Sequence, residues 1–190
     1  MLSISELEMV TNAELILTKN RIIRKVMELF GEVSAVAQTS LAQGLLRDLP
    51  EVQAMGPKIS KGEQYQELPW VMLDYPRLFS NQHVLAIRCF FWWGHDVSMV
   101  LHLKGDYAEK YRAALAANHW GAEMLFDTGT DEWNNDLTHP DFQAIQQIPA
   151  SAWQERSYIR IATKIPLREW DRIESFLINQ YQYFNQVLTA

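Results

Sequence analysis

The sequence has little cysteine and no long apolar segment. Cys89 is the only cysteine, so the chain can form neither an intramolecular disulfide nor a zinc site built from cysteine ligands. No run of about 18 apolar residues occurs, so no segment is a candidate for a membrane-spanning helix. The first ten residues lack the basic start and apolar core of a secretory signal. We therefore expect a cytoplasmic protein with no membrane association.

Positive charge is also in short supply. The chain has 17 Lys and Arg against 23 Asp and Glu, for a net charge of −6 at pH 7. The basic residues are scattered along the sequence. Binding to a phosphate backbone needs a basic face, so we expect no nucleic-acid partner.

Local signatures of known chemistry are missing. The five histidines never fall in the H-x-H, H-x-x-x-H or H-E-x-x-H spacing of metal ligands. Residues 127–136 have the composition of a calcium loop but lack its residue order and its final glutamate. The sequence contains no nucleophile elbow, phosphate-binding loop or dinucleotide fingerprint. We expect no metal and no cofactor, and the sequence does not indicate a reaction.

The chain is instead rich in aromatic residues. Aromatic residues make up 12%, apolar residues 48% and charged residues 21%, which is typical of a globular protein. A length of 190 residues suffices for one core and is short for two. We therefore expect a single α+β domain over residues 1–190, with many large flat side chains in its core.

Apolar spacing predicts a long helix at each end. From Leu15 to Val36, apolar residues recur at intervals of three, four or seven positions, which predicts an amphipathic helix that begins near Ser5 or Thr11 and ends near Gln38. A second such stripe follows Pro166. Between them the strands cluster, which favours an antiparallel sheet of about four or five strands with both helices packed on one face.

Residues 82–104 predict a β-hairpin around Gly94. A two-residue turn with Gly94 in first place would pair Arg88 with Leu101 and Ile87 with His102. Arg88 would then be the only charge on the core face of the sheet, whereas Cys89 and His102 would share the half-polar face. A longer loop would change the partners but keep the alternation within each strand.

Arg88 is the most informative single residue. A guanidinium on an apolar strand face needs a carboxylate, a bound anion or a route to water. It is either an anion clamp at the bottom of a pocket or the partner of a neighbour such as Asp74 or Glu63.

Residues 50–69 are rich in Pro and Gly in a polar setting, which predicts an irregular loop, and residues 70–75 form a short strand candidate that ends at Pro76. The segment 61–77 before the hairpin is dense in polar and aromatic side chains. If this loop folds over the sheet edge, its side chains converge with those of the hairpin; otherwise it is a solvated connector. The ligand-binding residues predicted on this basis are Arg88, Asp74, Tyr75, His102, Glu63 and Tyr65.

These features predict a cytoplasmic binding or interaction protein with an aromatic-lined pocket for a small anionic or polar molecule. The alternative is an enzyme that uses the same pocket, with Asp74 or Glu63 as general base and His102 as acid–base partner. A purely structural subunit is the third hypothesis. Surplus apolar surface at Phe91, at Trp93 and on the terminal helices predicts a homodimer.

Overall fold

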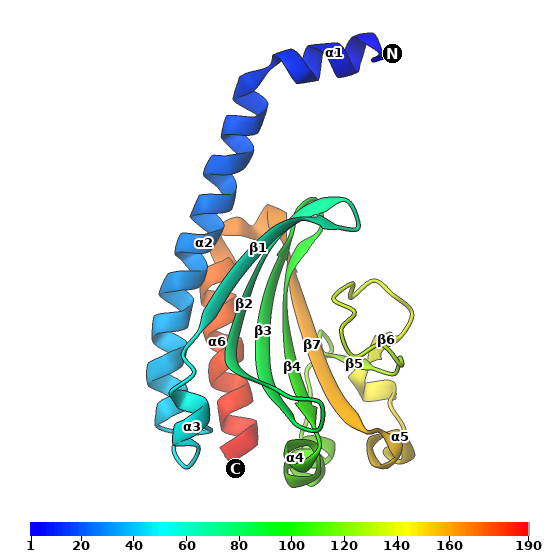
Figure 1. The fold of residues 1–190 in the computed structure, drawn as a ribbon. Helices are drawn as coiled ribbons and strands as arrows, with labels where there is room; N and C mark the ends of the chain where they lie inside the picture. The colour runs from blue at the N-terminus through cyan, green and yellow to red at the C-terminus, as the bar shows by residue number, and fades with distance from the viewer. Residues whose placement is uncertain (190) are drawn as a thin grey trace.

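The computed structural model describes residues 1–189 and is built around one seven-stranded antiparallel sheet (Figure 1). The strand order is β1-β2-β3-β4-β7-β5-β6. The strands are β1 (Lys58–Tyr65), β2 (Leu68–Phe79), β3 (Val84–Trp92), β4 (Asp96–Lys104), β5 (Leu125–Asp127), β6 (Phe142–Ala144) and β7 (Tyr158–Pro166). This confirms the α+β class and the antiparallel sheet, but the sheet has more strands than the four or five predicted.

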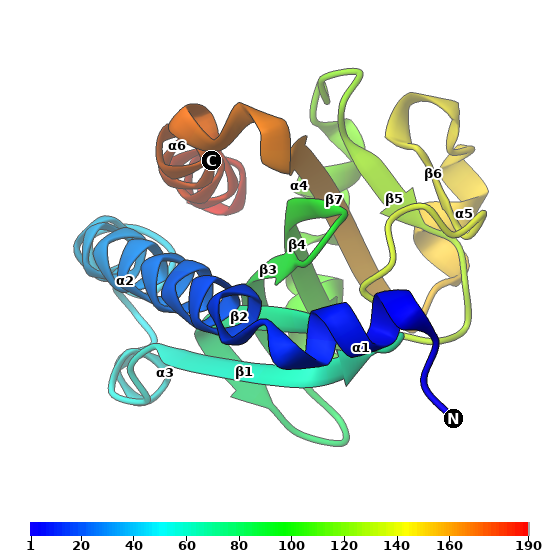
Figure 2. The same cartoon turned by 90° about the horizontal axis from the view of Figure 1, so that it is seen from above.

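Helices stand at both ends of the chain, as predicted. They are α1 (Ile4–Thr11), α2 (Ala13–Ala42), α3 (Pro50–Gln53), α4 (Asp106–Ala117), α5 (Ala150–Glu155) and α6 (Trp170–Thr189), with single 3₁₀ turns at Ile145–Gln147 and Leu167–Glu169. The long helices α2 and α6 lie side by side on one face of the sheet (Figure 2). We call this face the helix face and the opposite one the loop face.

The main core lies between the helix face and these two helices. Alternate strand residues point into it, as the two-residue period of a strand requires. From β3 and β4 these are Leu85, Ile87, Cys89, Phe91, Val97, Met99, Leu101 and Leu103, all at most 2% exposed. They pack against apolar stripes that include Phe30 of α2 and Phe184 of α6.

The hairpin forms as predicted but with a different register. Its loop has three residues rather than two, and the His95 amide donates to the Trp92 carbonyl at 3.1 Å. Gly94 has φ +79°, which suits the third position of a type II turn. Arg88 therefore faces Val100, and His102 faces Ala86. The predicted pairs of Arg88 with Leu101 and of Ile87 with His102 are wrong by one residue.

This change moves two polar residues onto the same face. Arg88 and His102 both point to the loop face, whereas Cys89 lies in the helix-face core. The prediction placed the main core on the side of Arg88, and that assignment is wrong. One extra loop residue accounts for the difference, because a one-residue slip exchanges the faces of one strand relative to its partner.

The strand predicted at residues 70–75 is confirmed within β2, whereas residues 61–69, predicted as a loop, belong to the sheet and its turn. They belong to the β1–β2 hairpin, whose turn uses positive φ at Gln66 and Glu67. Pro76 follows a cis peptide bond at Tyr75, at a β-bulge between Asp74 and Arg77. A bulge accommodates a proline that cannot donate to the ladder.

The N-terminal helix is not continuous. Asn12 breaks it, caps α2 through a 3.1 Å bond from the Glu14 amide, and turns α1 away from the axis of α2 (Figures 1 and 2). Every residue from Met1 to Leu17 is exposed, and the first buried residue is Ile23. We call residues 1–17 the N-terminal arm; it extends beyond the sheet rather than covering it.

Candidate functional site

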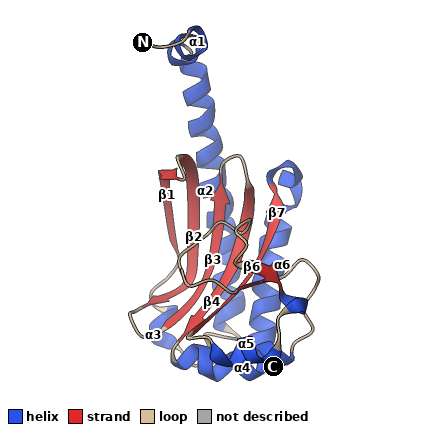
Figure 3. Cartoon of the chain, turned by 90° about the vertical axis from the view of Figure 1, so that its right-hand side faces the viewer, coloured by secondary structure: helices blue, strands red, loops and turns tan. Residues whose placement is uncertain are grey.

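The loop face carries a group of charged side chains beneath the segment between β5 and β6. Residues 128–141, called here the covering segment, cross in front of the central strands (Figure 3). The strands below contribute Asp74, Arg88, His102, Lys104 and Arg160, and the end of β5 contributes Asp127. These side chains are mostly shielded from water, so each charge needs a specific partner.

Arg88 and Asp74 are direct cross-strand neighbours on β3 and β2. The Arg88 Nε donates to Asp74 Oδ1 at 2.7 Å, and a second guanidinium nitrogen donates to Oδ2 at 3.1 Å. This forked geometry is the strongest form of arginine–carboxylate pairing. Of the two interpretations of Arg88, the structure shows the pairing with Asp74.

A second and deeper ion pair joins β7 to β5. Arg160 donates to Asp127 Oδ2 at 2.5 Å, and both side chains are only 2% exposed. Another Arg160 nitrogen donates to the Asn134 carbonyl of the covering segment at 2.6 Å. The Arg160 Nε is buried and has no hydrogen-bond partner among the described residues.

His102 and Lys104 hold the covering segment through one carboxylate. Glu132 lies 3.2 Å from His102 Nε2 and accepts a 2.6 Å bond from Lys104. Burial, together with the charges of Arg160, Arg88 and Lys104, lowers the pKa of His102 to about 3. His102 is therefore neutral at pH 7, with its proton on Nε2, where it donates to the carboxylate.

Trp133 closes the site from above. Its ring lies 5.9 Å from the Arg88 guanidinium carbon, 5.3 Å from the His102 ring and 5.8 Å from the Phe79 ring. Below it, a cavity is bounded by Phe79, Arg88, Val100, His102, Glu132 and Arg160. The space that the centre of a water molecule can occupy in this cavity is about 10 Å³, so the cavity has room for one water.

Tyr65 fixes the far side of the covering segment. Its hydroxyl lies 3.3 Å from Asn134 Oδ1 and accepts a 3.0 Å bond from the Asn135 amide. Its ring contacts those of Phe90 and Trp92 edge-on, at 5.1 and 5.2 Å. Tyr65 thus lies on the loop face but belongs to an aromatic cluster and not to the cavity.

Two of the predicted site residues do not join the others. Tyr75 is 1% exposed in the helix-face core, and Glu63 is an exposed residue that pairs with Lys19 at 2.7 Å. Cys89 also lies apart from His102, with its thiol 3.6 Å from the Tyr181 hydroxyl, and burial raises its pKa to about 12. The prediction that Cys89 and His102 share one face of the sheet is therefore wrong, and the two side chains do not form a nucleophilic pair.

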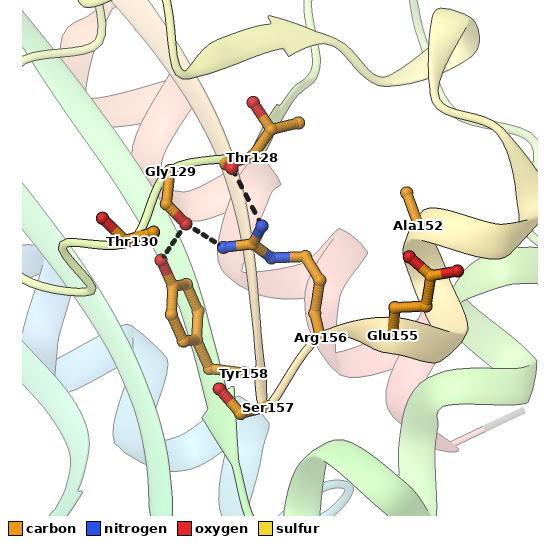
Figure 4. Close-up of a pocket in the computed structure, with 8 residues that line it drawn as sticks. All are labelled: Thr128, Gly129, Thr130, Ala152, Glu155, Arg156, Ser157 and Tyr158. Carbon is orange, nitrogen blue, oxygen red and sulfur yellow. Dashed lines mark hydrogen bonds between the residues drawn. The ribbon is translucent and has the colours of Figure 1, made fainter.

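A wider hollow of about 420 Å³ opens beside the covering segment (Figure 4). Arg156 reaches across it to the carbonyls of Thr128 and Gly129, and the Tyr158 hydroxyl donates to the Gly129 carbonyl at 2.7 Å. These donors are occupied in holding the backbone of the covering segment. The hollow thus shows how that segment is anchored.

Four residues of the site were not among those predicted from the sequence. Arg160, Asp127 and Glu132 come from segments distant from the hairpin in sequence, whereas Lys104 is the last residue of the hairpin's second strand. The alternation of residues 157–165 does place Arg160 on a polar face, but only the β4–β7 pairing brings it beside His102.

Comparison with known proteins does not assign the chain to a group. It matches no protein-family model, and comparison with curated proteins and with solved structures finds no match. No helix in residues 1–189 is both long and apolar enough to cross a membrane. Within the same range, no cluster of three or more His, Cys, Asp or Glu residues could hold a metal ion.

Proposed function

We propose that the protein is a cytoplasmic interaction protein whose N-terminal arm is its docking element. The observation that carries the proposal is the exposure of nine large apolar side chains within residues 1–17, each at least half exposed. They are Met1, Leu2, Ile4, Leu7, Met9, Val10, Leu15, Ile16 and Leu17. An exposed apolar set of this size marks an interaction surface.

The arm is helical, but its helix α1 packs on no other part of the described chain. Ser3 and Glu6 form a capping box at the start of α1, and Asn12 caps α2. Isolated helices shorter than about 12–15 residues are marginal in water, and α1 has eight residues, none of them buried. Packing of its apolar side chains on another surface would supply the missing stabilisation.

The charges of the arm favour a protein partner over a membrane. The arm carries Glu6, Glu8 and Glu14 and no Lys or Arg. Membrane-surface helices are typically basic on their polar face, because cytoplasmic leaflets are anionic. The arm fits an apolar protein surface flanked by basic side chains.

Photo-crosslinking tests this proposal. A photoreactive phenylalanine analogue replaces Leu7 in the full chain, and the same analogue at Val36, an exposed apolar residue on the body of α2, is the matched control. In cells we expect a discrete crosslinked protein from position 7, identified by mass spectrometry, and none from position 36. Equal labelling from both positions, no protein product, or flotation of the arm with anionic phospholipid vesicles would contradict the proposal.

A second candidate function is binding of a small anion or polar molecule under the covering segment. The specific observation is the buried Arg160 Nε, which has no partner among the described residues and belongs to a side chain that lines the cavity beside Arg88 and His102. The present cavity is too small for more than a water, so binding would require displacement of Glu132. An enzyme that uses His102 and Glu132 at this site stays a hypothesis of the same kind.

Thermal unfolding with acetate, oxalate and phosphate tests the second candidate. A bound anion at about 100 times its Kd stabilises the fold by about 2.7 kcal/mol, so a clear rise in Tm is expected. Arg160→Met would abolish the rise, whereas Arg172→Met at an exposed ion pair would not. The same rise in both variants, or none in the original chain, would exclude this function.

A further inference from the structure

We propose that the partner of the N-terminal arm is the arm of a second copy of the chain, paired antiparallel so that α1 of each copy lies along the first turns of α2 of the other. This inference rests on the function proposed above and names the occupant of that surface. It makes the protein a homodimer that is joined through its arms and not through its sheets.

Charge segregation along the N-terminal region supports the antiparallel arrangement. Residues 1–18 contain three glutamates and no Lys or Arg, whereas residues 19–25 contain four basic residues and no acidic residue. An antiparallel pair centred near Leu15 places Glu6 and Glu8 of one copy opposite Arg24 and Arg21 of the other. A parallel pair would place like charges together, which costs stability.

Some of this basic charge is free to meet a partner. Arg24 and Lys25 are exposed and form no ion pair within residues 1–189. On the acidic side, Glu6 is engaged only in the capping box with Ser3, whose bonds lower its pKa and keep it ionised. Glu6 and Arg24 are thus charged and accessible, whereas Arg21 pairs with Glu14 of its own chain at 2.7 Å and would exchange that partner in the dimer.

The available apolar area is also in the range of a specific interface. Full burial of a Leu, Ile, Val or Met side chain removes on the order of 100 Å² of apolar surface. Nine side chains that are half or more exposed give at most roughly 500 Å² per copy, or about 1,000 Å² for two if all of them are covered, near the lower bound for specific association.

The rest of the described surface has no comparable apolar region for the arm. Other large apolar side chains that are at least 38% exposed lie singly or in pairs, at Val36, Met55, Phe79, Trp133 and Trp170. The apolar surface that matches the arm in size is therefore the arm of another copy. Such a self-complementary patch forms a closed two-fold interface.

Sedimentation equilibrium of the full chain tests the inference. We expect a mass of twice 22.1 kDa in the micromolar range. Leu7→Gln with Val10→Gln removes apolar contacts without altering charge and yields a monomer. Its unfolding free energy should equal that of the original chain at dilutions where the original chain is also monomeric, because both residues are exposed. The matched control Val36→Gln stays a dimer.

Charge reversal tests the orientation. Glu6→Lys with Glu8→Lys, or Arg24→Glu with Lys25→Glu, weakens the antiparallel dimer by about tenfold or more, because several contacts turn repulsive at once. All four substitutions in one chain restore the original affinity. In a parallel pair neither double reversal would weaken association, which would overturn the proposed orientation.

The outcomes also separate this inference from the function it rests on. A monomer whose position 7 crosslinks to a different protein overturns the second copy as partner and leaves the interaction function standing. A monomer with no crosslink overturns both. A dimer that Leu7→Gln with Val10→Gln does not weaken shows that the copies join elsewhere and overturns the inference alone.

Discussion

Asp127→Asn is expected to lower the free energy of unfolding by about 3–5 kcal/mol, the largest effect of any single polar substitution in the chain. Asp127 and Arg160 are each 2% exposed and bonded at 2.5 Å, so the substitution leaves a guanidinium charge in a dry site. Asp127 Oδ1 also accepts the Gly129 amide at 2.8 Å, which fixes the start of the covering segment. Urea unfolding followed by tryptophan fluorescence measures the loss.

Two further variants define the cause of this loss. Asp127→Leu combined with Arg160→Met should cost much less than Asp127→Asn, because no unpaired charge remains. Arg47→Ala breaks an ion pair whose members are 72% and 82% exposed, and should change stability by less than about 0.5 kcal/mol. If Asp127→Asn behaves like Arg47→Ala, the site is solvated and the covering segment is not held by this pair.

Acid should destabilise the protein through His102. The pKa of this imidazole is about 3 in the fold and 6.5 in the unfolded chain, so between these values only the unfolded chain binds the proton. Its contribution to stability is complete above pH 6.5 and declines as the pH falls towards 3. The slope from this one group is about 1.4 kcal/mol per pH unit.

His102→Gln isolates this contribution, since glutamine can still donate to Glu132 but does not titrate. Between pH 6.5 and 4.5 the variant should lose about 1.4 kcal/mol per pH unit less than the original chain. Urea unfolding at several pH values gives both slopes, and the ¹⁵N shifts of His102 report its charge directly. Parallel slopes, or an imidazole that becomes charged near pH 6, would contradict the arrangement described for the site.

The sequence predicted the elements with strong local patterns. Period-two alternation located β3, β4 and β7, and the apolar stripes located α2 and α6. The register was missed because it depends on whether the loop around Gly94 has two or three residues, and Gly94 suits positive φ in both turns. Proline at 69 and 76 and glycine at 62 suggested a loop where the bulged β1–β2 hairpin forms; the bulge and long-range pairing accommodate these residues.

Part of the site was predictable for a similar reason. Arg88 was a conspicuous charge in an apolar strand, and Asp74 was one of two proposed carboxylate partners. Tyr75 was misplaced because its side chain points to the face opposite that of Asp74. Asp127 and Glu132 belong to a segment with no periodic pattern, whose position depends on contacts with strands that are distant in sequence.

The N-terminal arm shows the limit of periodicity in another way. The stripe from Leu15 onwards predicted a helix that covers the sheet, and α2 does so from Ile23. The apolar side chains of residues 1–17 have no surface of their own chain beneath them. Periodicity identifies an apolar helix face but not which molecule covers it.

Hydrogen exchange at the backbone amides of residues 4–20 in the full chain tests the central claim most directly. If the arm is docked on a second copy, these amides exchange at least about tenfold more slowly in the original chain than in the Leu7→Gln, Val10→Gln variant, and the difference shrinks on dilution. Amides of β3 and β4 should exchange alike in both chains. Equal and fast exchange of the arm amides in the two chains at every concentration would contradict the claim.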